Sequence, residues 1–278
     1  MKTITSVAAA ALILGLAACN PVGAAPTKVA EATETVSLVE KPKLSEEVEA
    51  LPRLVGDSPA ILRINAELDR LDATATADAK ECVEMAGDGP GGGWSRAITR
   101  PMTGPAFVTM REHVEVYCGG AYPSTTQTAI TYDLSTGARA NWVALLPALA
   151  LVQDEPMAEL PADYIYSVRS PQLEALYERK MIADADDAEW RDGCREVWKP
   201  KLEDETGGQG FNVWADAVHG GVAIDADYVH AVQACGGTVY LSADEMRAAG
   251  APAGLINALT AAMAAGNWSP KEEAEAAE

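Results

Sequence analysis

Residues 1–19 constrain the chain most, because they decide the compartment in which the rest of it folds. Met1-Lys2 supplies a positive end, and residues 7–18 form an apolar stretch. That stretch has the length of a signal-peptide core and is too short for a stable membrane span. It ends in Leu16-Ala17-Ala18-Cys19, the small residues and cysteine of a lipobox. We therefore expect cleavage before Cys19 and lipidation of its thiol; the alternative is an ordinary secretory signal with an incidental cysteine.

The residue after the lipidated cysteine bears on the membrane that holds the anchor. Asn20 stands where an aspartate would favour retention at the inner membrane, so we expect an outer-membrane lipoprotein that faces the periplasm. Two or three acyl chains would anchor it durably, since one chain alone is marginal. The later apolar residues 142–152 are too few for a second span and contain Pro147. The expected organisation is a signal peptide (1–18), a lipid-anchored flexible linker (19–57), one folded domain (58–266) and an acidic disordered tail (267–278).

The other four cysteines are Cys82, Cys118, Cys194 and Cys235. An even number of cysteines in an exported chain predicts two disulfides. Four cysteines allow three pairings, and the sequence alone does not choose among them. We favour Cys82–Cys118 and Cys194–Cys235, because each bridge would join a predicted helix to a strand of its own half. A metal site is disfavoured, since the sequence has no Cys-x-x-Cys pair and no histidine at ligand spacing.

The charge of the chain limits its partners. The formal net charge is −20 at pH 7. Nucleic acid and anionic lipid headgroups would be repelled by such a surface, so neither is expected as a partner. A cationic partner is compatible with this charge, although the solubility of an alanine-rich surface is the simpler explanation.

The spacing of apolar residues predicts the secondary structure. Ile61, Ile64, Leu68 and Leu71 recur at intervals of three and four, which indicates one face of a helix that runs from about residue 58 to 85. Residues 106–116 and 125–134 alternate between apolar and polar, as half-buried strands do. The other expected elements are a strand or loop (140–146), helices (170–182, 186–198, 252–265 and one after Ser242), a hairpin (209–216 with 221–228) and strands (229–232, 238–241). Runs of helices separated from runs of strands predict an α+β fold, an antiparallel sheet packed by several helices.

Three strings of residues carry a family resemblance. They are Tyr117-Cys118-Gly119-Gly120-Ala121-Tyr122-Pro123, then Ile130-Thr131-Tyr132-Asp133-Leu134-Ser135-Thr136-Gly137, then Trp142-Val143-Ala144-Leu145-Leu146. Together they resemble the C-terminal domain of RsiV-type lysozyme-sensing anti-sigma factors, a domain of unknown function that also occurs beside peptidoglycan deacetylase domains and in bacterial lipoproteins. Phe211-Asn212-Val213-Trp214, Gly221-Val222 and Leu241-Ser242 are similar to the closing strands of that domain. The resemblance covers residues 58–262.

The chain departs from the family pattern at two places. Tyr122 replaces the family's usual histidine, which puts any role of that imidazole in doubt. Cys118 and Cys235 add bridges that many relatives lack. The resemblance implies binding without catalysis, because the sensor relatives bind lysozyme through this domain. A cationic enzyme such as lysozyme and a chain of charge −20 would also attract one another at long range.

Four residues of the first string are ligand-binding candidates: Gly119, Gly120, Tyr122 and Pro123. Glycines allow backbone angles closed to other residues, and the Tyr-Pro pair presents an aromatic ring on a stiff corner. The alternative interpretation is structural: these residues form the turn that lets the two neighbouring strands pair as a hairpin. Asp133 is expected to shape the next turn by accepting hydrogen bonds from the amides of Thr136 or Gly137.

No catalytic motif stands out. His113, His219 and His230 lie in three separate segments, and the sequence has no Gly-x-Ser-x-Gly, Ser-x-x-Lys or His-Glu-x-x-His. The glycine cluster at 88–93 lacks the Lys-Ser/Thr of a phosphate loop. We therefore expect no enzyme, no cofactor and no metal, but a lipid-anchored periplasmic binding module of the cell envelope, with lysozyme or peptidoglycan as its ligand. The alternatives are a structural or accessory lipoprotein of an outer-membrane complex and a peptidoglycan-modifying hydrolase.

Overall fold

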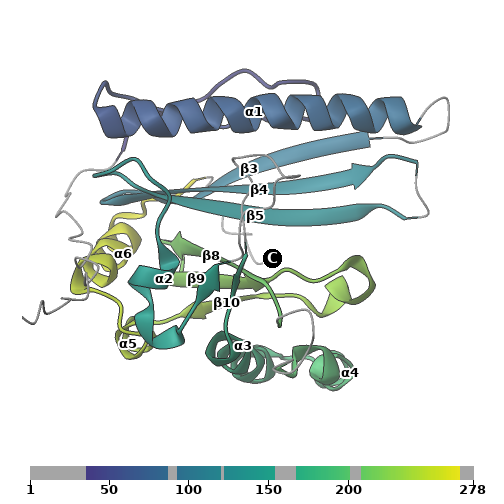
Figure 1. The fold of residues 1–278 in the computed structure, drawn as a ribbon, viewed down its shortest axis with the longest axis vertical. Helices are drawn as coiled ribbons and strands as arrows, with labels where there is room; N and C mark the ends of the chain where they lie inside the picture. Colours follow the sequence, from purple (N-terminus) through teal and green to yellow (C-terminus); the bar gives the residue numbers. More distant parts are fainter. Residues whose placement is uncertain (1–35, 87–92, 120–121, 154–166, 201–207, 270–278) are drawn as a thin grey trace, which may run out of the picture.

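Two antiparallel sheets lie face to face between helices (Figure 1). The computed structural model describes residues 36–86, 93–119, 122–153, 167–200 and 208–269. The first sheet has the strand order β3-β4-β5, and the second has the order β10-β9-β8-β7-β6. The chain therefore has the α+β architecture that the sequence predicts.

The bounds of the elements are as follows. The strands are β1 (Leu38–Val39), β2 (Arg53–Leu54), β3 (Gly93–Thr103), β4 (Phe107–Tyr117), β5 (Ser124–Asp133), β6 (Val152–Gln153), β7 (Val168–Arg169), β8 (Phe211–Asp216), β9 (Gly221–Ala226) and β10 (Thr238–Leu241). The helices are α1 (Pro59–Ala86), α2 (Trp142–Leu145), η1 (Pro147–Leu149), α3 (Pro171–Asp184), α4 (Ala188–Trp198), η2 (His230–Cys235), α5 (Ala243–Ala248) and α6 (Ala253–Ala265).

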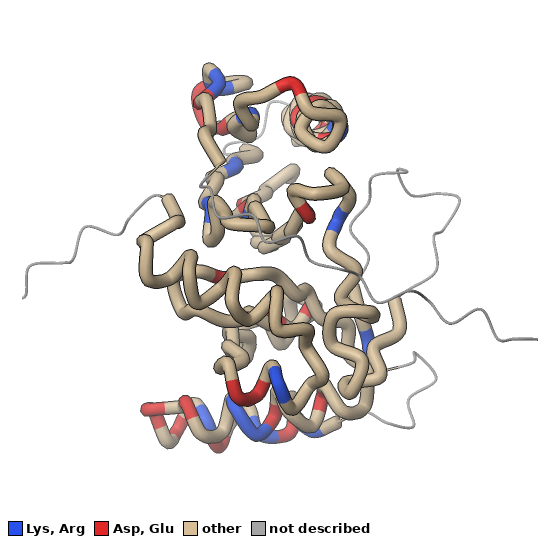
Figure 2. The backbone as a smooth tube through the Cα atoms, turned by 90° about the vertical axis from the view of Figure 1, so that its left-hand side faces the viewer, with Lys and Arg blue, Asp and Glu red and all other residues tan. Residues whose placement is uncertain are grey.

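Helix α1 covers one face of the three-stranded sheet, as Figure 1 shows. Its buried residues Ile64 and Leu68 pack against Met110 of β4 and Ile130 of β5. Acidic and basic residues are interspersed along α1 (Figure 2), and most of them are exposed, as on the solvated face of a helix. The other face of the sheet looks toward the second sheet, whose far side is covered by α3 and α4. The layers are thus helix, sheet, sheet and helices.

A buried ion-pair network joins α1 to the sheet. The guanidinium of Arg96 on β3 is fully buried; it contacts the carboxylate of Asp72 on α1 and lies 3.3 Å from Glu112 Oε2 on β4. Arg53 also lies 2.8 Å from Asp72. Burial raises the pKa of Glu112, and the charge of Arg96 opposes that rise. Because each charge has a partner of opposite sign, the network can lie inside the core without leaving a buried charge unpaired.

The linker prediction is wrong for residues 36–57. Val48, Leu51 and Leu54 are almost fully buried, and the Leu51 amide donates to Asp72 Oδ1 at 3.1 Å. The segment forms only two short strands, so the spacing of its apolar residues shows neither the period of a helix nor that of a strand. The sequence pattern therefore does not predict that it is folded. The tail prediction also begins too early, since Ser269 exchanges two backbone hydrogen bonds with Arg100.

Three further local predictions differ from the structure. Residues 142–145 form a short helix, because the Asn141 side chain accepts from the Ala144 amide at 3.1 Å and caps it. Residues 230–235 form the 3-10 helix η2 where a strand was expected at 229–232. Strand β3 was not predicted, since it buries Arg96 and contains Pro101, which mask its alternation. The short elements η1, β6 and β7 were not predicted either, whereas the predicted helices α1, α3, α4, α5 and α6 and the predicted strands β4, β5, β8, β9 and β10 lie within a few residues of their expected places.

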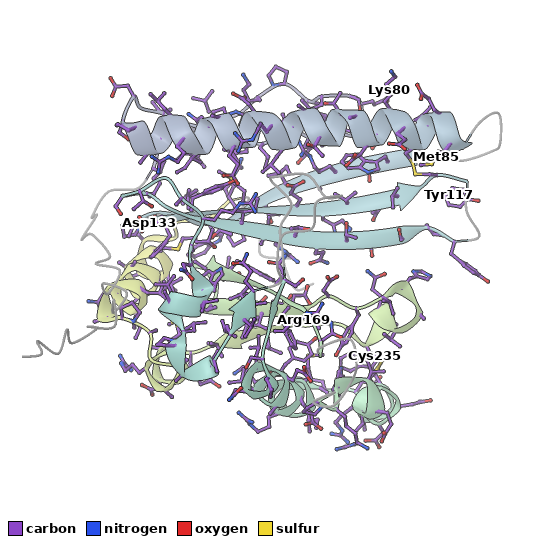
Figure 3. The ribbon with its side chains drawn as sticks, viewed as in Figure 1. Lys80, Met85, Tyr117, Asp133, Arg169 and Cys235 are labelled. Carbon is purple, nitrogen blue, oxygen red and sulfur yellow. A yellow bond between two sulfur atoms is a disulfide. The ribbon has the colours of Figure 1, made fainter. Side chains whose placement is uncertain are left out.

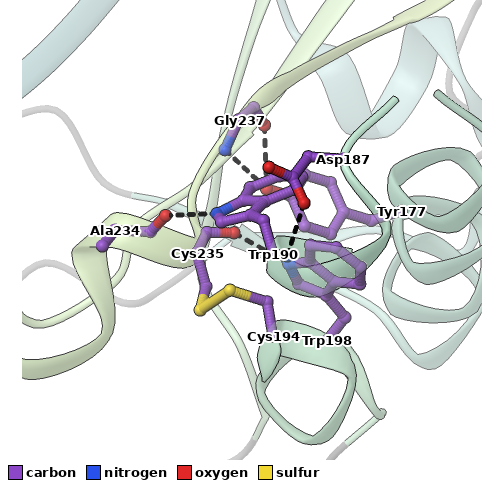
Figure 4. The surroundings of a disulfide bond; sticks show 8 residues. All are labelled: Tyr177, Asp187, Trp190, Cys194, Trp198, Ala234, Cys235 and Gly237. Carbon is purple, nitrogen blue, oxygen red and sulfur yellow. Dashed lines mark hydrogen bonds between the residues drawn. A yellow bond between two sulfur atoms is a disulfide. The ribbon is translucent and has the colours of Figure 1, made fainter. Parts of the chain in front are cut away.

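The disulfides are the predicted ones. Cys82–Cys118 joins α1 to the end of β4, and Cys194–Cys235 joins α4 to η2. Around the second bridge (Figure 4), the indoles of Trp190 and Trp198 donate to the carbonyls of Ala234 and Cys235 at 2.9 and 2.7 Å. The bridge and these bonds fix η2 to the helical layer.

The Asp133–Gly137 turn has a structural role. The Asp133 side chain accepts from the Ser135 amide at 2.7 Å, whereas the amides of Thr136 and Gly137 donate to the main-chain carbonyl of Asp133. Gly137 has φ +70°, and a Cβ there would lie 2.3 Å from the Ala60 carbonyl oxygen. Glycine is thus needed where this turn contacts the start of α1. Figure 3 shows that Asp133 lies at one end of the three-stranded sheet and Tyr117 at the other.

Candidate ligand-binding cleft

The two sheets are joined at one end by a buried threonine pair. The Thr109 hydroxyl on β4 donates to the Ala215 carbonyl of β8 at 2.8 Å, and the Ala215 amide donates to Thr131 Oγ1 on β5 at 3.0 Å. The two hydroxyl oxygens lie 2.9 Å apart. Next to this joint, Ala129, Trp214 and Ala223 pack together as a small apolar cluster. The sheets are therefore in firm contact here.

Beyond the joint, the facing sides of the sheets become polar and enclose a cleft. Register pairs Asn212 of β8 with Asp225 of β9, and Asp225 with Thr238 of β10, so the three form one row across the second sheet. Arg111 and Gln127 stand on the opposite wall, on β4 and β5. The cleft belongs to a cavity of about 820 Å³, a size typical of ligand sites.

Arg111 is the central cation of the cleft. Its guanidinium carbon lies 5.5 Å from the ring centroid of Trp214, and its Nη2 donates to Gln127 Oε1. The Nε of Arg111 and the indole Nε1 of Trp214 are buried donors without a partner in the described part of the chain. Buried donors are rarely left unpaired, and Arg111 lines the cavity, so its Nε is placed to donate to an oxygen of a bound molecule.

Asp225 is the acid of the cleft. Burial raises its pKa from 3.8 to about 6, although the Arg111 charge and the Ala226 amide oppose this rise. At neutral pH the carboxylate is charged but poorly solvated. A cationic or hydrogen-bond-donating group of a ligand would relieve that desolvation.

This raised pKa predicts a pH-dependent effect of Asp225→Asn. Between pH 4 and 6 the folded chain keeps a proton on Asp225 that the unfolded chain has lost, so this group makes stability fall as pH rises. We expect the variant to be more stable than the wild type by about 1–3 kcal/mol at pH 7, and nearly equal to it at pH 4. Urea unfolding at both pH values measures this. The exposed neighbour Asp227 supplies the control, and equal effects of Asp225→Asn at both pH values would contradict the assignment.

The cavity also reaches the opposite face of the three-stranded sheet. Side chains of β4 point alternately to the two faces, with Met110 toward α1 and Arg111 toward β8. On the α1 side the cavity is lined by Leu71, Thr74, Ala75, Asp78, Trp94, Glu112, Val114, Val116, Thr126 and Thr128. The four consecutive residues 125–128 of β5 all line it, so the cavity passes around the edge of β5. A second cavity of about 260 Å³ continues along Ala129, Ile130 and Thr131.

The sequence-based candidates lie outside the cavity lining. Tyr122 is 74% exposed and stacks on His230 with ring centroids 6.0 Å apart, and Pro123 is also exposed. Gly119 has φ +87° and follows the Cys82–Cys118 bridge. Gly120 and Cys19, the predicted lipidation site, fall outside the described residues. Ligand contact by these residues stays a prediction.

The Tyr122–His230 pair nevertheless stands beside one end of the cleft. Gln233 of η2, which lines the cavity, donates from Nε2 to the Thr125 carbonyl of β5. This bond and the stacked rings bridge η2 to the first residues of β5. The cleft is thus held by Thr109 and Thr131 at one end and by η2 at the other.

The histidines occupy three different places. His113 Nε2 lies 3.4 Å from Glu115, while His219 Nδ1 lies 3.1 Å from Asp216 and its ring stacks on Tyr240. Over the described ranges, no three His, Cys, Asp or Glu side chains are grouped so as to hold a metal ion.

Sequence reasoning missed the residues that line the cleft. Asp225 interrupts the apolar run Gly221-Val222-Ala223-Ile224, and a charge in a buried strand is a usable signal. The alternation of β4 places Arg111 opposite Met110, but it does not say what Arg111 faces. That depends on which sheet faces meet, and no local pattern encodes it.

Comparison with known proteins assigns no family. No protein-family model matches the chain, and no curated protein matches it either. Within the described ranges, no helix is both long and apolar enough to cross a membrane.

Proposed function

We propose that the chain is a lipid-anchored, non-catalytic binding module of the cell envelope, and that an envelope partner such as lysozyme or peptidoglycan docks at the cleft beside β5. The observation that carries this proposal is the 820 Å³ cavity lined by Arg111, whose buried Nε has no partner in the described part of the chain. A ligand oxygen that accepts a hydrogen bond from this Nε would satisfy the donor.

Two features of the sequence support this setting. The lipobox ending in Cys19 favours a lipid anchor, and Asn20 after it favours the outer membrane with the domain facing the periplasm. The resemblance to the lysozyme-sensing domain favours binding over catalysis. A net charge of −20 would also speed the encounter with a cationic enzyme.

A pull-down tests the proposal. Full-length protein in detergent micelles is immobilised and exposed to lysozyme or to peptidoglycan sacculi at low salt. We expect Thr238→Trp, which fills the cleft from β10, to reduce retention by about tenfold or more. Thr76→Trp on the exposed side of α1 is the matched control and should retain the partner as the wild type does. No retention of either partner, or equal loss in both variants, would refute docking at the cleft.

One observation favours a second candidate, a peptidoglycan-modifying hydrolase. A carboxyl in a cleft with a pKa of about 6, as for Asp225, is suited to general acid catalysis. This candidate requires turnover of sacculi by the purified chain and loss of that turnover in Asp225→Asn.

A further inference from the structure

The outer edge of β5 offers unpaired main-chain groups. The Asp133 amide donates to Ala138 at 2.9 Å and the Thr131 carbonyl accepts from Ala140 at 2.7 Å, so odd-numbered residues of β5 direct their amide and carbonyl away from β4. Gln127 and Ala129 share this orientation. Their outward groups have no hydrogen-bond partner in the part of the chain that the structure describes.

Among the described residues, the two ends of this edge are covered and its middle is not. The 138–140 segment pairs with the Thr131–Asp133 end, and Gln233 donates to the Thr125 carbonyl at the other. Exposed sheet edges promote aggregation, so proteins commonly cover or shorten them. The stretch at residues 126–130, which no described segment pairs with, has the length for a few residues of a partner strand.

Space for an added strand exists beside this open stretch. The cavity passes around β5 at residues 125–128, and the second cavity continues at Ala129. A strand placed there would direct successive side chains into the inter-sheet cleft and into the α1-side branch alternately.

The two sides differ in chemistry. In the cleft, the carboxylates of Asp225 and Asp227 outnumber the cation of Arg111, which already contacts Gln127 and Trp214. The α1 side presents the apolar groups of Leu71, Ala75, Trp94, Val114 and Val116, together with three threonines (Thr74, Thr126, Thr128) and the exposed carboxylate of Asp78. Glu112 on that side is already paired with Arg96.

We propose that β5 is a docking edge for an extended peptide segment of a partner protein, which adds as a strand beside Gln127 and Ala129. Its basic side chains enter the inter-sheet cleft and its apolar side chains enter the α1 side. This inference rests on the proposed function, because it uses the same cleft. It adds that the part of the partner that docks there is a protein segment. Main-chain bonds to β5 supply affinity, and the alternation supplies specificity.

Two peptides of equal composition test the proposal on the full-length protein in detergent. The alternating probe is acetyl-Lys-Val-Lys-Val-Lys-Val-amide, and its control is acetyl-Lys-Lys-Lys-Val-Val-Val-amide. We expect the alternating peptide to bind about tenfold more tightly, because only it can match both sides of β5. Equal affinities would overturn the proposal.

Residue-resolved amide exchange locates the peptide. On binding, the amides of Gln127 and Ala129 should exchange about tenfold more slowly, whereas those of Thr126 and Thr128 already face β4 and should not change. Gln127→Pro removes an outward N–H and should weaken binding about five- to tenfold relative to Gln127→Ala, which loses the same side chain contact.

The outcomes separate this proposal from the broader one. Retention of lysozyme or sacculi with unprotected Gln127 and Ala129 amides would refute strand addition and leave binding at the cleft intact. Peptide binding with protection at both amides, without retention of either named partner, would support strand addition and discard those partners. Equal peptide affinity in the two Gln127 variants would also refute it.

Discussion

Arg96→Ala is expected to lower the free energy of unfolding by about 3–5 kcal/mol, the range found when one member of a buried ion pair is removed. The side chain of Arg96 is fully buried between Asp72 and Glu112, and it also donates to the Glu49 carbonyl at 2.9 Å. Its loss leaves the buried Glu112 carboxylate without its cation, leaves Asp72 with Arg53 as its remaining cation, and removes the side-chain bond from β3 to the Glu49 carbonyl. Urea denaturation at pH 7 measures the change.

The matched control for Arg96 is an arginine on the solvent side of α1. Arg70→Ala removes an exposed side chain that donates only to the Ala66 carbonyl of its own helix, and should change stability by less than about 0.5 kcal/mol. If Arg96→Ala cost no more than Arg70→Ala, the network would not hold α1 to the sheet.

Removal of the Cys194–Cys235 bridge should have the second large effect. The double variant Cys194→Ala/Cys235→Ala opens a loop with a sequence separation of 41, which in the chain-entropy model costs about 3–4 kcal/mol. We expect a nearly equal loss for Cys82→Ala/Cys118→Ala, whose separation is 36. Thermal unfolding of both variants measures this, with the oxidised wild type as reference.

The two bridges should differ in their effect on the cleft. Cys235 ends η2, which carries the Gln233 contact to β5, so loss of the second bridge should also loosen that end of the cleft. Faster exchange of the η2 amides in the Cys194/Cys235 variant alone would report it. Full retention of stability in either double variant would contradict the structural role of that bridge.

The sequence predicts the elements whose signals are local. Helix α1 follows from the spacing of its apolar residues, and β4 and β5 follow from their alternation. Ser242 begins α5 with a reciprocal pair of side-chain bonds to Glu245, which the motif itself indicates. The favoured disulfide pairing is confirmed, but the sequence allowed three pairings, and Cys235 lies in η2 and not in the expected strand.

The rest of the structure depends on contacts between distant segments. Leu51 is buried because Asp72 and Arg53 hold its segment against α1, and β3 stays regular although it contains Arg96 and Pro101. The cleft forms where Arg111 of the first sheet contacts Trp214 of the second sheet. Such long-range pairing leaves no period in the sequence.

Photocrosslinking in the living cell tests the central claim, docking at the cleft, most directly. A benzoylphenylalanine is placed at position 227, an exposed residue of the cleft lining, or at position 76 on the exposed side of α1. We expect an adduct with an envelope partner from position 227 and none from position 76. An adduct from position 76 alone, or equal yields from both, would contradict it.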